Sequence, residues 1–267
     1  MRQRQGFIQA INSLAKLLRG RPDIPPSLAD NAMLHAIMRR RSVRTFTSEA
    51  IPEAVFQAIL EAGRLAPSTV NLQSWTFAVF DADLWHRSFG HAIPFHASRA
   101  VIVISDTHRY RQLMPEFPNC PLTEHTAAVI NASLAAMTMN LAAEALGVSS
   151  VMLSETGRSG LLDARYLREK LKLPDGTVPL MTIVFGYARG GYPPMPPKLP
   201  IEQITMGSQY TPPDPVIMED WLAQMIAGYN ISHLGTSFQA HLNAYKSKIE
   251  QAEIDLQELV FGQSLPT

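Results

Sequence analysis

The segment that most constrains the fold is the stretch from Leu122 to Leu146, which is rich in alanine and methionine. Its apolar residues cover most of the circumference of a helix, and a helix that is apolar on all sides has to be buried. Gly147 follows directly and suits the left-handed conformation that ends many helices. We therefore expect one long helix enclosed by other elements.

Four apolar segments are short or alternating enough to form strands, and the last of them is typical of a central strand. They are residues 76–80, 100–105, 149–153 and 179–187. Further helices are predicted at 29–39, 52–65 and 161–173. Regular βαβ spacing and a Gly-x-Gly-x-x-Gly motif are both missing, which disfavours a dinucleotide-binding Rossmann fold. The pattern predicts an α+β protein with a mixed sheet flanked by helices.

Both ends of the chain carry helical signals outside this pattern. Residues 7–18 form a basic amphipathic stripe, for which packing on the protein is favoured over a membrane surface. A proline-rich segment at 190–200 reads as an extended arm. From Phe238 to Leu259 a four-three spacing predicts a helix with one apolar seam, which packs on the body, on a partner subunit or on another helix. We expect an N-terminal extension at 1–28, a core domain at 29–205 and a C-terminal arm at 206–267.

The composition of the chain limits the kinds of binding partner and the cellular compartment that we expect. Lys plus Arg and Asp plus Glu both number 23, so no net charge attracts nucleic acid or an anionic membrane. The single cysteine, Cys120, excludes an internal disulfide. No apolar run approaches the roughly 20 residues that span a bilayer, and we expect a cytoplasmic protein. His86, His91 and His96 share no helix or strand face, so no metal site is predicted.

Two polar motifs are candidates for a binding site. Arg39, Arg40, Arg41 and Arg44 surround Ser42 just after a predicted helix. Guanidinium groups and a hydroxyl that converge can clamp a phosphate, although a basic cluster is more often a solvated helix end.

The second motif is the loop APSTVNLQSW, which supplies hydroxyl and amide groups after Pro67. Amides present donors and acceptors side by side, as the edge of a planar heterocycle requires. An ordinary polar loop is the alternative interpretation. Together the motifs suggest a phosphate at one end of a ligand and a ring system at the other.

The stretch from Arg40 to Phe80 resembles the opening signature of the nitroreductase superfamily. In that family an Arg-x-Ser-x-Arg/Lys segment holds the FMN phosphate, and a Pro-Ser-x-x-Asn-x-Gln-Pro-Trp loop borders the flavin. The similarity continues through EALGVSS, MLSETG, VFGYA and PPKLPIEQI, and it covers about residues 33–204. The resemblance implies a nitroreductase-like, FMN-binding domain at 29–205.

The resemblance also assigns roles to individual residues. By resemblance, the residues that bind the phosphate side of FMN are Arg40, Arg41, Ser42, Arg44 and Lys198. The residues that border the flavin ring are Pro67, Ser68, Asn71 and Gln73. The loop Ser154, Glu155, Thr156 and Gly157 matches the segment that contacts flavin N5, where Glu155 and Thr156 act through their backbone N–H groups.

Three positions depart from the family pattern. Ser74 replaces the proline of Gln-Pro-Trp, which loosens the backbone restriction there. Lys198 replaces an arginine and loses its bidentate fork. Thr138 stands where asparagine is common, and the tail beyond Met206 has no counterpart. These departures leave the substrate undefined.

By resemblance, the chain is expected to be an oxidoreductase in which NADH or NADPH reduces FMN and a nitroaromatic, quinone or similar acceptor then reoxidises it, in ping-pong order. The resemblance also implies a homodimer with FMN at the subunit interface, which the terminal helices embrace. Two alternatives stay open. One is a specialised FMN enzyme that dehalogenates, fragments flavin or oxidises a dedicated substrate, and the other is a flavin-free adaptor on the same fold.

Overall fold

The computed structural model of the 267-residue chain describes residues 25–28, 30–114, 119–154, 160–233 and 235–262. The chain divides into two compact units. The core unit comprises residues 26–192 and 248–267, and the arm unit comprises residues 1–25 and 193–247. The predicted helix at 7–18 lies outside the described residues.

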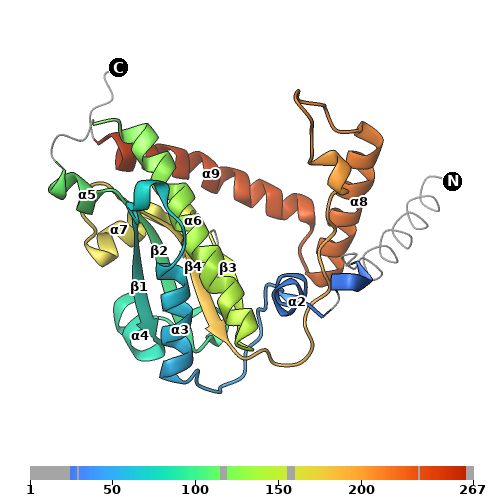
Figure 1. Cartoon of the computed structure of the whole chain (residues 1–267), viewed down its shortest axis with the longest axis horizontal. Helices are drawn as coiled ribbons and strands as arrows, with labels where there is room; N and C mark the ends of the chain where they lie inside the picture. Colours follow the sequence, from blue (N-terminus) through green and yellow to red (C-terminus); the bar gives the residue numbers. More distant parts are fainter. Residues whose placement is uncertain (1–24, 29, 115–118, 155–159, 234, 263–267) are drawn as a thin grey trace. The chain divides into compact units, whose positions relative to one another are not determined.

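A four-stranded sheet forms the centre of the core unit (Figure 1). Its order is β1-β2-β4-β3, and all three pairs are antiparallel. A parallel bridge joins Ser42 to Ser150 at the β3 edge. The four predicted strands are confirmed, and β4 is an interior strand as expected. Their bounds are β1 Trp75–Asp81, β2 Arg99–Asp106, β3 Ser149–Leu153 and β4 Thr177–Gly186.

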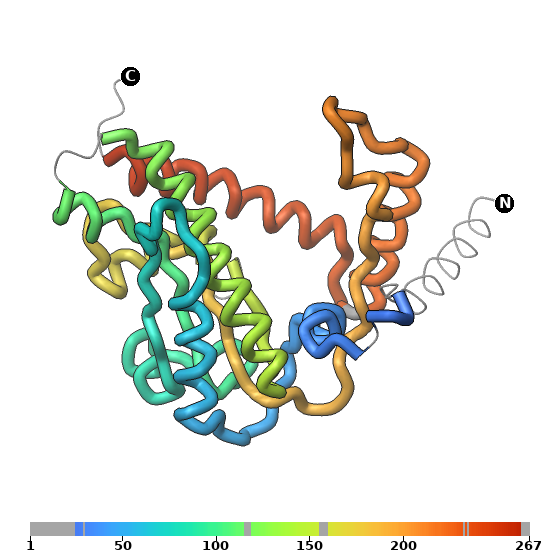
Figure 2. The backbone as a smooth tube through the Cα atoms, viewed as in Figure 1, coloured from blue at the N-terminus to red at the C-terminus, as the bar shows by residue number. Residues whose placement is uncertain are grey.

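One face of the sheet is covered by α3 (Glu53–Arg64) and α6 (Pro121–Ala145), which run side by side in Figure 2. Phe56 and Met139 are fully buried in this layer. A Cβ on Gly63 would lie 2.6 Å from Cγ of Met139, so glycine lets the two helices approach closely. By length and composition α6 could cross a membrane, but its buried residues belong to the core. The predicted long helix is therefore confirmed, and Gly147 has the expected positive φ of 76°. Its burial is confirmed on one side only, because Ile130 and Leu134 are 55% and 42% exposed within this chain.

The opposite face is covered by α4 (Ala82–Phe89) and α7 (Ala164–Leu171). Trp85 packs there on Phe80 of the edge strand β1, and Leu167 is fully buried where α7 contacts the inner strand β4. Asp81 begins α4 by accepting a 2.7 Å hydrogen bond from N of Leu84. Neither α4 nor α5 (His108–Leu113) was predicted, because helices this short have little periodicity. Helices on both faces make the predicted α+β architecture correct. The remaining core helices are η1 Pro26–Leu28, α2 Ala32–Arg39, η2 Thr69–Asn71, η3 Pro94–His96 and η4 Leu161–Asp163.

The last helix, α9 (Phe238–Phe261), begins in the arm unit and ends in the core unit. Its end joins the core through Leu259, which is 8% exposed. Arg165 of α7 pairs with Asp255 at 3.2 Å and also with Glu258. The predicted seam thus packs on the body at its C-terminal end, whereas Leu242 and Ile249 are 40% and 45% exposed.

The arm unit contains η5 (Ile201–Gln203), α8 (Pro215–Ser232) and the first part of α9. Asp214 accepts a 2.8 Å hydrogen bond from N of Val216 and Pro215 takes the first helical position, so α8 has a strong start signal. Apolar residues lie on all sides of α8, yet none of the described arm-unit residues is buried. Such a helix needs a covering surface.

Candidate functional site

The cationic segment begins where α2 ends. The Arg41 guanidinium turns back and donates to the carbonyls of Met38 at 2.6 Å and Arg40 at 2.8 Å. Burial lowers the pKa of Arg41, and the charge of Arg40 lowers it further. Arg41 therefore satisfies helix-end carbonyls, which is the structural role that a basic cluster often has.

Arg39 is held by a partner that the sequence did not indicate. Its Nε donates a 2.8 Å hydrogen bond to the carboxylate of Glu144, in the last turn of α6. This bond is the main reason that the pKa of Arg39 is raised. The hydroxyl of Tyr192 lies 3.3 Å from both carboxylate oxygens of Glu144. The pair thus fixes the end of α2 against α6.

Arg40 and Arg44 remain available for an anion. The Arg40 side chain makes no hydrogen bond or ion pair with the described residues, and the side chain of the exposed Arg44 has only a 3.4 Å contact with the carbonyl of Ser42. N of Val43 donates to the carbonyl of Ser150 at 3.1 Å, which ties this segment to β3. Two cations are therefore presented from an anchored backbone, as a phosphate site requires.

The loop before β1 presents its polar groups to solvent. Pro67, Asn71 and Gln73 are exposed, and Ser68 is half-buried. Oγ of Ser68 accepts a 3.0 Å hydrogen bond from N of Gln73, and Nε2 of Gln73 lies 3.4 Å from Oδ1 of Asn71. Hydrogen bonds within the loop thus hold its conformation, and the side-chain amides of Asn71 and Gln73 remain exposed to solvent, where a ligand can reach them.

The backbone of this loop is strained. Val70, Asn71 and Gln73 have φ values of 47°, 58° and 47°. Left-handed residues other than glycine cost about 1–3 kcal/mol each, and a β-branched valine is the least suited to this conformation. Such strain persists only where the surroundings hold it, and it often marks a functional segment.

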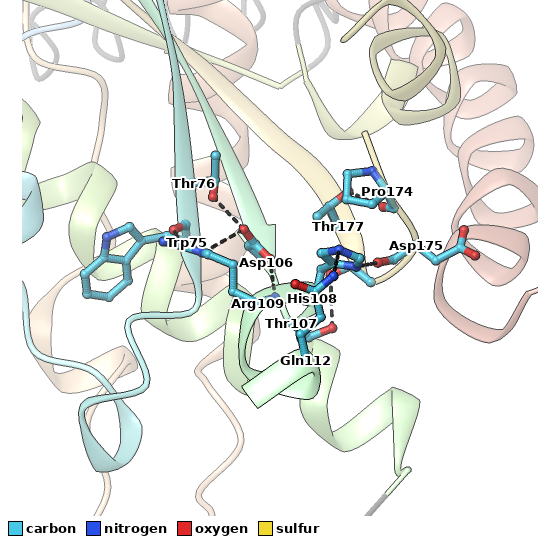
Figure 3. Close-up of polar contacts among 11 residues, drawn as sticks. Trp75, Thr76, Asp106, Thr107, His108, Arg109, Gln112, Pro174, Asp175 and Thr177 are labelled. Carbon is cyan, nitrogen blue, oxygen red and sulfur yellow. Dashed lines mark hydrogen bonds and ion pairs between the residues drawn. The ribbon is translucent and has the colours of Figure 1, made fainter. Parts of the chain in front are cut away.

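The end of the loop is anchored to the sheet through Asp106, as Figure 3 shows. This carboxylate accepts hydrogen bonds from Oγ1 of Thr76 at 2.5 Å and from Nε of Arg109 at 3.1 Å. The Arg109 guanidinium also donates to the carbonyl of Trp75. N of Asp106 donates to the carbonyl of Ser74 at 3.1 Å. The buried Asp106, paired with the partly exposed Arg109, thereby fixes the residues that join the loop to β1.

The segment expected to contact flavin N5 is described only at its first residue. Ser154 is exposed, whereas Glu155, Thr156 and Gly157 lie outside the described residues. A Cβ on Gly160 would lie 2.8–2.9 Å from Cα of Ser154 and from the carbonyls of Leu153 and Leu180. Glycine is therefore required where the segment returns to the sheet. Lys198 is exposed and belongs to the arm unit.

The two polar motifs are not adjacent within one chain. The loop contacts Asn131 of α6, and the cationic segment follows Arg39, which contacts Glu144. At about 1.5 Å per residue, α6 separates Asn131 from Glu144 by roughly 20 Å. The motifs also adjoin opposite edge strands, β1 and β3. The sequence indicated each motif but not their separation.

Comparison with known proteins identifies the family. The model of the nitroreductase family matches residues 37–93 and 86–187. The chain belongs to the nitroreductase family. An Archaeoglobus fulgidus relative, whose name proposes an NADH dehydrogenase/NAD(P)H nitroreductase, is 32% identical over 162 residues, or 58% of this chain and 85% of the relative. The oxygen-insensitive NADPH nitroreductase of Salmonella typhimurium is 26% identical over 71% of this chain and 79% of its own.

A solved structure agrees with the nitroreductase fold. The NADPH:FMN oxidoreductase of Vibrio harveyi, solved in complex with NAD+, superposes with a TM-score of 0.70. The match covers 87% of this chain and 98% of that chain at 20% identity. The predicted family and the predicted α+β fold are thus both confirmed.

Asn131, Asp106, Arg109 and Glu144 support the candidate site but were not predicted. Asn131 and Glu144 are polar residues buried in α6, at 1% and 4% exposure, as are Glu124 and Asn140. A polar residue at a buried helix position normally has a specific partner. That pattern was a usable signal, although it does not name the partner.

Proposed function

We propose that this nitroreductase-family protein is an FMN-dependent NAD(P)H oxidoreductase. The observation that carries the proposal is that a chain of the family fold presents both two available cations, Arg40 and Arg44, and an exposed amide loop. The names of relatives, among them an NADPH nitroreductase and an NADPH:FMN oxidoreductase, support this activity.

The residues present fit the chemical groups of FMN. Guanidinium groups at Arg40 and Arg44, with the hydroxyl of Ser42, can donate several charge-assisted hydrogen bonds to a phosphate. Asn71 and Gln73 offer the amides that pair with the carbonyl and imide edge of the flavin ring. Arg41 contributes mainly by holding the end of α2. Lys198 is proposed as a further phosphate contact.

Bound FMN would supply hydride acceptance from a nicotinamide and electron donation to an acceptor. The chain's own residues bind and orient the partners and restrict water. The backbone of the 154–157 segment is proposed to donate hydrogen bonds where negative charge develops. Nicotinamide and acceptor, a nitroaromatic, a quinone or a similar small molecule, occupy the same cavity in turn, which gives ping-pong kinetics. The cytoplasmic location stays a prediction.

We infer that each site is built by two protomers. The separation of roughly 20 Å along α6 favours a site in which the cationic segment of one chain faces the loop of its partner. Ile130, Leu134 and Met137 form an exposed apolar stripe on α6, with exposures of 55%, 42% and 40%. Exposed stripes of this kind mark association surfaces. In the same proposal, residues 29–205 form the FMN-binding domain and residues 206–267 form an arm that embraces the partner subunit.

Flavin titration tests the cofactor. The purified protein should be yellow, or should quench the fluorescence of added FMN, and Arg44→Ala should raise the Kd about tenfold by removing a charge-assisted bond. Arg87→Ala is the matched control, because Arg87 is an exposed arginine on α4, over the other face of the sheet. A colourless protein that takes up no FMN would support the adaptor alternative instead.

Anaerobic mixing tests the electron donor. NADH or NADPH should bleach the absorbance of the bound flavin within the turnover time, and a nitroaromatic or quinone should restore it. Flavin that binds but is not reduced by either nucleotide would favour a specialised FMN enzyme of the same family.

A further inference from the structure

The strained loop at 68–74 closes on itself through one buried residue of α6. Asn131 is 1% exposed. Its Oδ1 accepts hydrogen bonds from N of Thr69 at 3.1 Å and from Oγ1 of Thr69 at 3.2 Å. Its Nδ2 donates to Oγ of Ser74 at 2.8 Å. A single amide thus joins the first and last parts of the loop across the three left-handed residues.

The two ends of the loop are held differently. Ser74 is also fixed from the sheet, because its carbonyl accepts the bond from N of Asp106. The next residue, Trp75, is held by Arg109 (Figure 3). At the start of the loop, Asn131 provides the hydrogen bonds to Thr69. Loss of the Asn131 amide would therefore release the start of the loop, and left-handed Val70 and Asn71 would relax toward ordinary backbone conformations.

The contact with Ser74 gives a reason for serine at this position. The related motif has proline here, which restricts the backbone by its ring. The sequence alone indicates that serine loosens the segment. In the structure Ser74 is 3% exposed and its hydroxyl is bonded to Asn131, so the segment is restrained by a side chain of α6 instead of by a ring.

We propose that Asn131 is the positioning residue for the ring end of the flavin site, and that its bond to Ser74 replaces the restriction of the missing proline. The inference rests on the proposed function for its ligand. Asn131 does not touch the ligand. It holds the loop in the strained conformation that directs Asn71 and Gln73 outward.

Flavin binding provides the first test, with FMN and riboflavin as probes. Ser74→Ala removes the hydrogen bond between Asn131 and Ser74, and it should raise the Kd for FMN and for riboflavin about fivefold. Asn131→Leu should raise both Kd values at least tenfold. The double variant should match Asn131→Leu, because the two residues act as one unit. Arg44→Ala should weaken FMN but leave riboflavin unchanged, which separates the phosphate end from the ring end. Unchanged riboflavin affinity in Asn131→Leu would overturn the proposal.

Two controls address folding and the role of proline. Ser105→Ala removes another buried hydroxyl, whose Oγ donates to the carbonyl of Val178 at 3.3 Å, and it should leave flavin affinity unchanged. Ser74→Pro should bind flavin as the natural chain does. If Ser74→Pro weakens binding as much as Ser74→Ala, the bond does not stand in for proline.

Amide hydrogen exchange tests the loop without any flavin. Asn131→Leu should speed exchange at Thr69, whose N–H loses its acceptor, and at Gln73, whose N–H is bonded to Ser68. Exchange in β2 should stay unchanged. If the protein binds no flavin but shows this local acceleration, the proposed function fails while the positioning role stands. Unchanged exchange at both amides contradicts the positioning role.

Discussion

Nε of Arg39 donates to a Glu144 carboxylate whose side chain is 2% exposed, whereas the Arg39 side chain is 64% exposed. The buried member of this pair thus depends on a partner at the surface. The bond spans 105 positions in the sequence and fixes the start of the cationic segment.

This asymmetry predicts unequal effects of removing each partner. Arg39→Ala leaves a buried carboxylate with Tyr192 as its remaining partner, and we expect a loss of about 2 kcal/mol in the free energy of unfolding. Glu144→Gln leaves an exposed arginine and keeps a hydrogen-bonding group inside, so its cost should be below about 1 kcal/mol. Urea denaturation measures both values. Equal losses would show that the buried charge does not dominate.

Gly160 should tolerate no side chain. Its added Cβ would lie 2.8–2.9 Å from three backbone atoms, which cannot move aside as a flexible side chain can. We expect Gly160→Ala to lower the free energy of unfolding by roughly 1–3 kcal/mol. Gly191→Ala is the matched control, because a Cβ there meets nothing within 4 Å. Similar stability of the two variants would contradict this close approach.

The exposed stripe on α6 should be a subunit contact. A variant with both Ile130→Glu and Leu134→Glu places two charges in the stripe, and we expect it to sediment as a monomer and to bind FMN weakly. Leu84→Glu serves as the control, since Leu84 is 39% exposed on α4, over the other face of the sheet. A double variant that remains dimeric would place the subunit contact elsewhere.

Stability should depend on pH through His125. Burial lowers the pKa of His125 below its ordinary 6.5, so the folded state favours the neutral imidazole. As the pH falls below about 6.5 the unfolded chain takes up the proton first, and stability decreases until the folded form is protonated too. Above that pH the contribution is constant. Urea denaturation at several pH values measures the free energy of unfolding of the natural chain and of His125→Gln. This free energy should decrease less in the variant as the pH falls, and an equal decrease in both would refute the assignment.

The sequence by itself determined the elements whose signals are local. The apolar pattern of 122–146 predicted the long helix α6, although not its exposed side, and alternation marked the strands. The two polar motifs and their family were equally visible, since each lies within a few residues. Short α4 gave too few turns for a period, and α8 carries no one-sided stripe.

Only the tertiary structure decided which distant residues meet. Arg39 meets Glu144 and Thr69 meets Asn131 across 105 and 62 positions, and no local pattern specifies such pairs. The same packing places the cationic segment and the loop roughly 20 Å apart along α6, because contacts at Asn131 and Glu144 anchor them to different turns of one rigid helix. The sequence thus identified the two motifs of the candidate site, and the distance along α6 between Asn131 and Glu144 determined how far apart they lie.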